Sequence, residues 1–143
     1  MSDQPAAEHR RPEGVDDATV EAVGRLTEAL ETIERARGHL YSFHQLTGEA
    51  DFKIGDAVDL LRHAGHTELA DRLGVEIVGR NVLPGRWTFQ IMEDYDDTYW
   101  SVLREAERDV RERLTAGRRH LAEAELKEER RTHGHPDHTA RPE

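Results

Sequence analysis

Hydrophobic side chains recur every three or four residues along most of this chain, which is the spacing of one face of an α-helix. The first such stripe consists of Val20, Val23, Leu26, Leu30, Ile33, Ala36, Leu40, Phe43 and Leu46. Asp16 or Asp17 can cap the start of this helix, and Gly48 can end it. The pattern therefore predicts a first long helix over about residues 17–47.

Two shorter segments with the same period follow. The first covers about residues 52–64 and is ended by Gly65. The second covers about residues 67–82, with Thr67 at its start, and a Pro84–Gly85 pair then predicts a turn. These segments form a predicted short helical pair between two longer elements.

The longest stripe predicts a second long helix over about residues 88–131. Its members are Met92, Tyr95, Tyr99, Leu103, Ala106, Val110, Leu114, Gly117, Leu121 and Ala124. The pairs Glu107–Arg111 and Asp109–Arg113 have the i,i+4 spacing that stabilises a helix. Residues 118–131 carry only a thin apolar stripe, so this part could project beyond the rest.

No segment alternates as a strand does, so the expected fold is all-α: an antiparallel helical bundle of two long helices and a short pair. Residues 1–14 and 132–143 lack the apolar side chains that would offset the entropy cost of ordering them. We therefore expect one helical domain over residues 15–131, flanked by two disordered tails.

Composition excludes several classes of function. The chain has no cysteine, hence no disulfide, thiolate metal site or cysteine nucleophile. Its net charge of −10 opposes binding to nucleic acid, whose phosphates are also negative. We find no signal peptide and no apolar run long enough to span a membrane, and we expect a cytoplasmic protein.

The stretch EDYDDTYW, residues 93–100, concentrates acidic and aromatic side chains. One interpretation is an acidic helix start, where carboxylates interact favourably with the helix dipole, with Tyr95 and Tyr99 facing inward. The other is a functional pair of carboxylates that binds a cation or an arginine. The chain contains no Glu-x-x-His, which argues against a di-iron type of metal centre.

Five of the eight Phe, Trp and Tyr residues lie between positions 87 and 100. Trp and Arg are common in interface hot spots, although Trp87 could instead pack onto Met92 and close the end of the bundle. We expect a non-enzymatic interaction module that binds a protein partner or forms a homodimer, and a regulatory role is one hypothesis for it. The proposed binding face comprises Arg86, Trp87, Phe89, Asp94, Asp97 and Trp100.

A rival hypothesis places a metal or small-ligand site at histidines on the boundary of the core. The candidates are His39, His44, His63 and His66, which could hold zinc or haem, although we expect no cofactor. The tail histidines His133, His135 and His138 could act as a weak chelator. A helical enzyme that uses Asp96, Asp97 and His44 is a third reading, and no sequence feature indicates its substrate.

Overall fold

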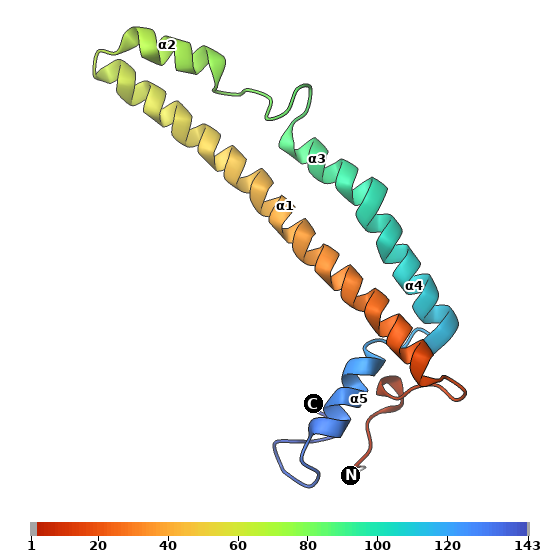
Figure 1. Cartoon of the computed structure of the whole chain (residues 1–143). Coiled ribbons are helices and arrows are strands. Elements are labelled where there is room, and N and C mark those ends of the chain that lie inside the picture. Colours follow the sequence, from red (N-terminus) through yellow and green to blue (C-terminus); the bar gives the residue numbers. More distant parts are fainter. Residues whose placement is uncertain (1–2, 143) are drawn as a thin grey trace. The chain divides into compact units, whose positions relative to one another are not determined.

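The computed structural model describes residues 3–142 and is all-α, as expected (Figure 1). Its elements are a short 3₁₀ turn (Ala7–His9), α1 (Asp17–His63), α2 (Thr67–Glu76), α3 (Thr88–Tyr95), a π-helix (Asp96–Trp100), α4 (Ser101–Thr115) and α5 (Leu121–Arg130). No strand occurs within residues 3–142. None of the helices in this range combines the length and the apolar composition needed to cross a bilayer.

Helix α1 is one continuous helix, so the predicted end at Gly48 is wrong and the segments 17–47 and 52–64 are joined. A glycine inside a helix costs only about 1 kcal/mol relative to alanine, which packing on both sides of it can offset. The predicted start is confirmed, because Asp16 Oδ1 accepts the Thr19 N–H at 2.8 Å. The predicted stop at Gly65 is also confirmed: its φ of +90° closes the helix in a Schellman turn.

The long helix predicted over residues 88–131 is interrupted twice. Thr88 is its first residue, as predicted, but residues 96–100 are π-helical. The chain then leaves the helix after Thr115, passes through left-handed conformations at Ala116, Gly117 and His120, and resumes as α5. The predicted helix 67–82 is likewise shorter, since α2 ends at Glu76 and Gly79 has a φ of +73°.

The chain divides into two compact units, which are described separately below. Unit 1 comprises residues 1–33 and 101–143, and unit 2 comprises residues 34–100. In unit 1 the buried apolar side chains are Val20, Val23 and Leu121. Glu107 is buried beside them and accepts hydrogen bonds from Thr27 and Arg111. The predicted pairs Glu107–Arg111 and Asp109–Arg113 are both confirmed, at 3.0 and 2.9 Å.

Both ends of the described chain make polar contacts within unit 1. Arg11 binds Glu125 of α5 through two hydrogen bonds, of 2.8 and 2.9 Å. The buried Arg131 guanidinium binds Glu128 and the side chain of Asp3, which lies near the other end of the chain. Arg141 of the second predicted tail, 132–143, also donates to the Gln4 carbonyl of the first, 1–14, at 2.9 Å, so residues of both tails lie at the same end of unit 1.

In unit 2, α3 and the π-helix run antiparallel to the middle of α1, along residues 34–44 (Figure 1). Three contacts show the register: Arg37 with Asp96, His44 with Thr88, and Asp51 with Gly79. Helix α2 folds back along the end of α1 after the turn at Gly65. The buried apolar side chains of this unit are only Val58, Ala70 and Met92.

Candidate functional site

Unit 2 contains a polar and aromatic cluster around Arg37, on the side of α1 that faces the π-helix. The guanidinium of Arg37 donates two hydrogen bonds to the carboxylate of Asp96, at 2.7 and 3.1 Å. Both side chains are about three-quarters buried, at 23% and 22% exposure. The hydrogen bonds from Arg37 hold the pKa of Asp96 below its ordinary value, and Asp96 in turn raises the pKa of Arg37.

Two aromatic rings enclose the same guanidinium. Its carbon lies 4.2 Å from the centre of the Trp100 ring and 4.9 Å from that of Tyr41, within the range of cation–π attraction. The Trp100 indole N–H also donates to Glu34 at 2.6 Å. Asp96 and Trp100 are the first and last residues of the π-helix, a rare conformation found frequently at functional sites.

The stretch EDYDDTYW, at the end of α3 and in the π-helix, is therefore where this part of the chain packs on α1. Asp96 receives an arginine partner, as one of the two readings of the sequence allowed. Tyr95 is half-buried and stacks with Tyr99 at 5.7 Å, whereas Tyr99 is 51% exposed. The arrangement fixes the π-helix in place on α1.

The start of α3 presents an exposed aromatic pair. The rings of Trp87 and Phe89 are 5.3 Å apart, and these residues are 55% and 43% exposed. The Trp87 N–H donates to the side chain of Gln90 at 2.9 Å, which fixes the first turn of the helix. Arg86 and Asp94 form an ion pair beside the two rings. We refer to Arg86, Trp87, Phe89 and Asp94 as the Trp87 surface.

The structure thus brings together four of the six residues of the predicted binding face, and the other two, Asp97 and Trp100, lie on the π-helix. Trp100 stacks on Arg37 and is half-buried, so it supports α3 rather than sharing the Trp87 surface. Asp97 is exposed on the π-helix. Sequence reasoning omitted Arg37 and Tyr41, which lie in the other helix and have no local signal that distinguishes them from other arginines and tyrosines.

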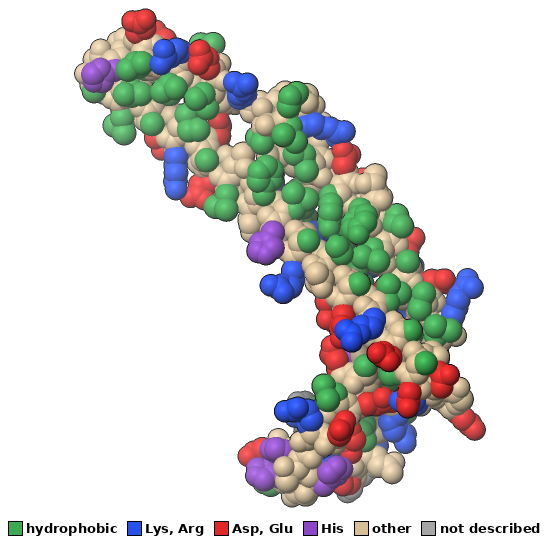
Figure 2. Space-filling view, in the orientation of Figure 1, with side chains coloured by type: hydrophobic (Ala, Val, Ile, Leu, Met, Phe, Trp, Pro, Cys, Tyr) green, Lys and Arg blue, Asp and Glu red, His purple; other side chains and the backbone are tan. Residues whose placement is uncertain are grey.

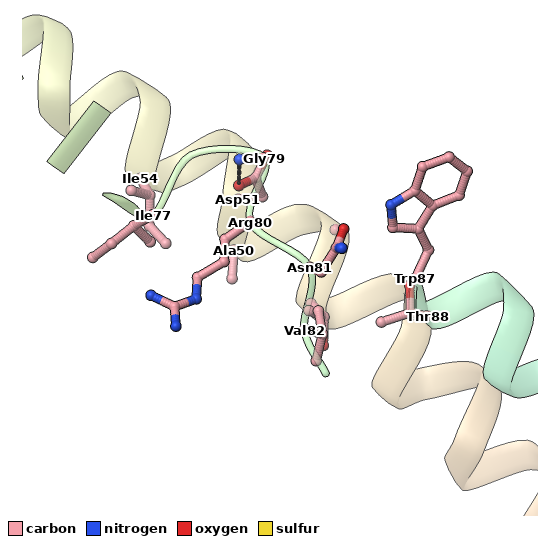
Figure 3. Close-up of a pocket in the computed structure, with 12 residues that line it drawn as sticks. Ala50, Asp51, Ile54, Ile77, Gly79, Arg80, Asn81, Val82, Trp87 and Thr88 are labelled. Carbon is pink, nitrogen blue, oxygen red and sulfur yellow. Dashed lines mark hydrogen bonds between the residues drawn. The ribbon is translucent and has the colours of Figure 1, made fainter. Parts of the chain in front are cut away.

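A groove of about 370 Å³ lies beside the Trp87 surface, between α1 and residues 77–88 (Figure 3). Ile54 of α1 and Ile77 lie side by side at one end, and the Trp87 indole points away from α1 at the other. The carboxylate of the lining, Asp51, accepts the Gly79 N–H at 2.9 Å. The groove therefore offers mainly apolar contact, in a volume at the small end of the range for ligand pockets.

The four histidines of the rival hypothesis are not assembled into one site in this structure. His44 Nδ1 lies 2.6 Å from Thr88 Oγ1, and His63 Nδ1 lies 3.1 Å from the Asp59 carbonyl. His39 is exposed on α1, and His66 is the N-cap residue of α2. None of the four belongs to a group of three close potential metal ligands within the described part of the chain.

Such a group does occur in unit 1, where Glu31, His120 and Glu123 bring their ligand atoms within 4.8 Å of one another. All three side chains are about half exposed. Imidazole and carboxylate together suit zinc and other divalent transition metals. Sequence reasoning missed the group because it depends on the helix break before His120, which the uninterrupted hydrophobic period concealed.

Comparison of the chain with protein-family models, with curated proteins and with solved structures finds no match. A function can therefore be argued only from the chemistry of the side chains. The strongest feature of that kind is the Trp87 surface, because large aromatic side chains are exposed there on a well-supported helix start.

Proposed function

We propose that the chain is a helical protein-interaction module and that the Trp87 surface docks a protein partner. The observation that carries the proposal is the exposure of two neighbouring aromatic residues, Trp87 at 55% and Phe89 at 43%, whose rings lie 5.3 Å apart. Burying an aromatic side chain at an interface removes roughly 150–250 Å² of surface from water. An exposed pair beside an open apolar groove is thus a strong anchor for a partner.

The surface is held in place before any partner arrives. Gln90 fixes the first turn of α3, and Thr88 contacts His44 of α1. Further along, Asp96 and Trp100 hold the π-helix on Arg37. A pre-organised anchor loses little conformational entropy on binding, which favours affinity.

The alternative role for Trp87, as a plug at the end of the bundle, has less support. Met92 is buried at 5% exposure, whereas more than half of Trp87 remains exposed. The residues that bury α3 against α1 are therefore others, including Met92 and Trp100. Removal of the indole should leave the helices intact.

The charge around the surface indicates the chemistry of the partner. Glu93, Asp94 and Asp97 are all exposed near the start of α3 and on the π-helix. Arg86 pairs with Asp94, and Glu93 adds a negative charge near the start of α3. An apolar peptide or helix flanked by basic residues fits this combination, with the charges steering its approach.

The test is affinity capture from a lysate of the host, with the full-length protein as bait and quantitative mass spectrometry of the bound proteins. Trp87→Ala should lose a specific bound protein, whereas Val75→Ala, at an 85% exposed position on α2, should retain it. Circular dichroism of both variants should equal that of the wild type. An unchanged set of bound proteins for Trp87→Ala, or melting of the helices, would contradict the proposal.

A further inference from the structure

A group of potential metal ligands lies in unit 1, where α5 begins beside α1, and it shares no residue with the Trp87 surface. In the view of Figure 2, acidic, basic and histidine side chains are mixed over the region around α5. The group consists of Glu31 of α1, His120 just before α5 and Glu123 in the first turn of α5. Each offers one ligand atom, and these atoms lie within 4.8 Å of one another.

The packing of the backbone holds these three residues near one another. Leu121, the first residue of α5, is buried at 5% exposure. Ala122 lies against Gly24 of α1, because a Cβ added to the glycine would be only 3.2 Å from the alanine Cβ. The glycine thus allows the start of α5 to approach α1 closely. Glu31 follows on the same face of α1, seven residues and two turns further along.

The imidazole of His120 faces the two carboxylates. His120 is the N-cap residue of α5, yet its side chain makes no cap hydrogen bond. Its backbone is fixed, since its carbonyl accepts the Ala124 N–H at 2.8 Å and its φ is +55°. Its Nδ1 lies 3.8 Å from Glu31 Oε1 and 3.6 Å from Glu123 Oε2. One imidazole nitrogen therefore meets carboxylates from two helices.

These two distances suit a shared metal ion better than hydrogen bonds. A hydrogen bond from nitrogen to oxygen spans about 2.7–3.2 Å. Two ligand atoms on tetrahedral zinc, each about 2.0–2.2 Å from the metal, are about 3.4 Å apart. The observed separations of 3.6 and 3.8 Å exceed this value only slightly, and small rotations of the exposed side chains would close the difference.

The two carboxylates also lack a permanently charged partner. Within residues 3–142, Glu31 and Glu123 form ion pairs with His120 and with no arginine or lysine. Glu125, also on α5, is by contrast paired with Arg11 at 2.8 Å. Two carboxylates that converge on a neutral imidazole repel each other, and a divalent cation between them would replace this repulsion by attraction.

We propose that Glu31, His120 and Glu123 bind a divalent transition-metal ion, with zinc as the best match to the donor set. Imidazole and carboxylate both bind zinc, whereas Mg²⁺ and Ca²⁺ prefer oxygen ligands. Three protein ligands leave the fourth position of tetrahedral zinc to water. Because the ligands come from α1 and from the start of α5, the bound ion stabilises the folded state of unit 1.

The first test is calorimetric titration of the untagged full-length protein with ZnCl₂ near neutral pH, with MgCl₂ as the comparison. One Zn²⁺ per chain should bind more tightly than Mg²⁺. His120→Asn and Glu31→Gln should each weaken this binding at least about tenfold, because even residues behind a ligand often contribute that much. Asparagine suits both an N-cap and a left-handed backbone, so the fold should persist. His39→Asn, at an exposed position in unit 2, should bind zinc as the wild type does.

The second test locates the ion, because His133, His135 and His138 offer a competing chelator. The rings of the nine histidines give separate signals in proton–carbon NMR spectra, and the signal of His120 is the one absent from His120→Asn. The first equivalent of ZnCl₂ should shift that signal. It should also raise the melting temperature of the wild type and leave that of His120→Asn unchanged.

Three results would overturn the proposal: equal zinc affinity of the wild type and His120→Asn, Mg²⁺ binding as tight as that of Zn²⁺, or shifts confined to the other histidines. The first would reduce the group to an ion pair of His120 with its carboxylates. The inference is independent of the proposed function of the Trp87 surface. Trp87→Ala should bind zinc normally, and His120→Asn should still capture a protein partner.

Discussion

Arg37 is the residue on which the arrangement of unit 2 depends most clearly. It joins Asp96 by two hydrogen bonds and stacks between Tyr41 and Trp100. Asp96 and Trp100 are four residues apart, which in a helix places them on one face. The sequence could not show which arginine of α1 they meet, because Arg37 lies 59 residues from Asp96 and resembles several other arginines in composition and surroundings.

Replacement of Arg37 by alanine should lower the free energy of unfolding by about 1–3 kcal/mol, because Asp96 would be left partly buried without its hydrogen bonds. Urea denaturation followed by circular dichroism measures the change. Arg62→Ala is a matched control in the same unit, since the Arg62–Asp71 pair is 47% and 61% exposed and should contribute less than about 1 kcal/mol. Equal effects of the two changes would contradict the central role of Arg37.

The Arg37–Asp96 pair should also make the free energy of unfolding depend on pH in the acid range. Because the folded state lowers the pKa of Asp96, its contribution is complete above the unfolded value of about 3.9 and is lost as the pH falls through the lower folded value. Wild type and Asp96→Asn should therefore differ most near neutral pH and converge below about pH 4. Urea denaturation at a series of pH values tests this, and a difference that stays constant would refute it.

At the scale of the helices, the positions of starts and stops were partly predictable. Asp16, Gly65 and Thr88 mark boundaries that the structure confirms. The predictions were wrong at two places where the hydrophobic period continues across a glycine. At Gly48 the period continued and the helix did too. After Thr115 the period also continued, but the backbone broke, because Gly117 adopts a left-handed conformation and its carbonyl accepts a hydrogen bond from Arg111.

Glycines within α1 and the glycine just after it should respond to substitution in opposite ways. Gly48→Ala and Gly55→Ala should each stabilise the protein by about 0.5–1 kcal/mol, because an added Cβ meets nothing within 4 Å and alanine favours a helix. Gly65→Ala should destabilise it by about 1–2 kcal/mol, since the backbone there has a φ of +90°. Guanidinium denaturation midpoints give the sign of each change. Destabilisation by Gly48→Ala would mean that another surface packs closely on that position.

At the scale of the whole molecule, the all-α class followed from the hydrophobic period, and the division into two units did not. One boundary, between residues 33 and 34, lies inside α1, and the other lies between the π-helix and α4. Neither has a proline beside it, and the charged residues after Ile33 continue the helical pattern. Boundaries inside helices are set by which distant segments pack together, and a single sequence carries no direct record of that.

The two tryptophans of the chain lie in different environments, so their fluorescence can report separately on docking and on unfolding. Trp100 lies against a guanidinium and donates its N–H to a carboxylate, whereas Trp87 is largely in water. The emission of Trp87 should shift to shorter wavelength when a partner covers it, while that of Trp100 should change only when unit 2 unfolds. A Trp100→Phe variant would leave Trp87 as the only indole, so that docking could be followed by fluorescence without any attached dye.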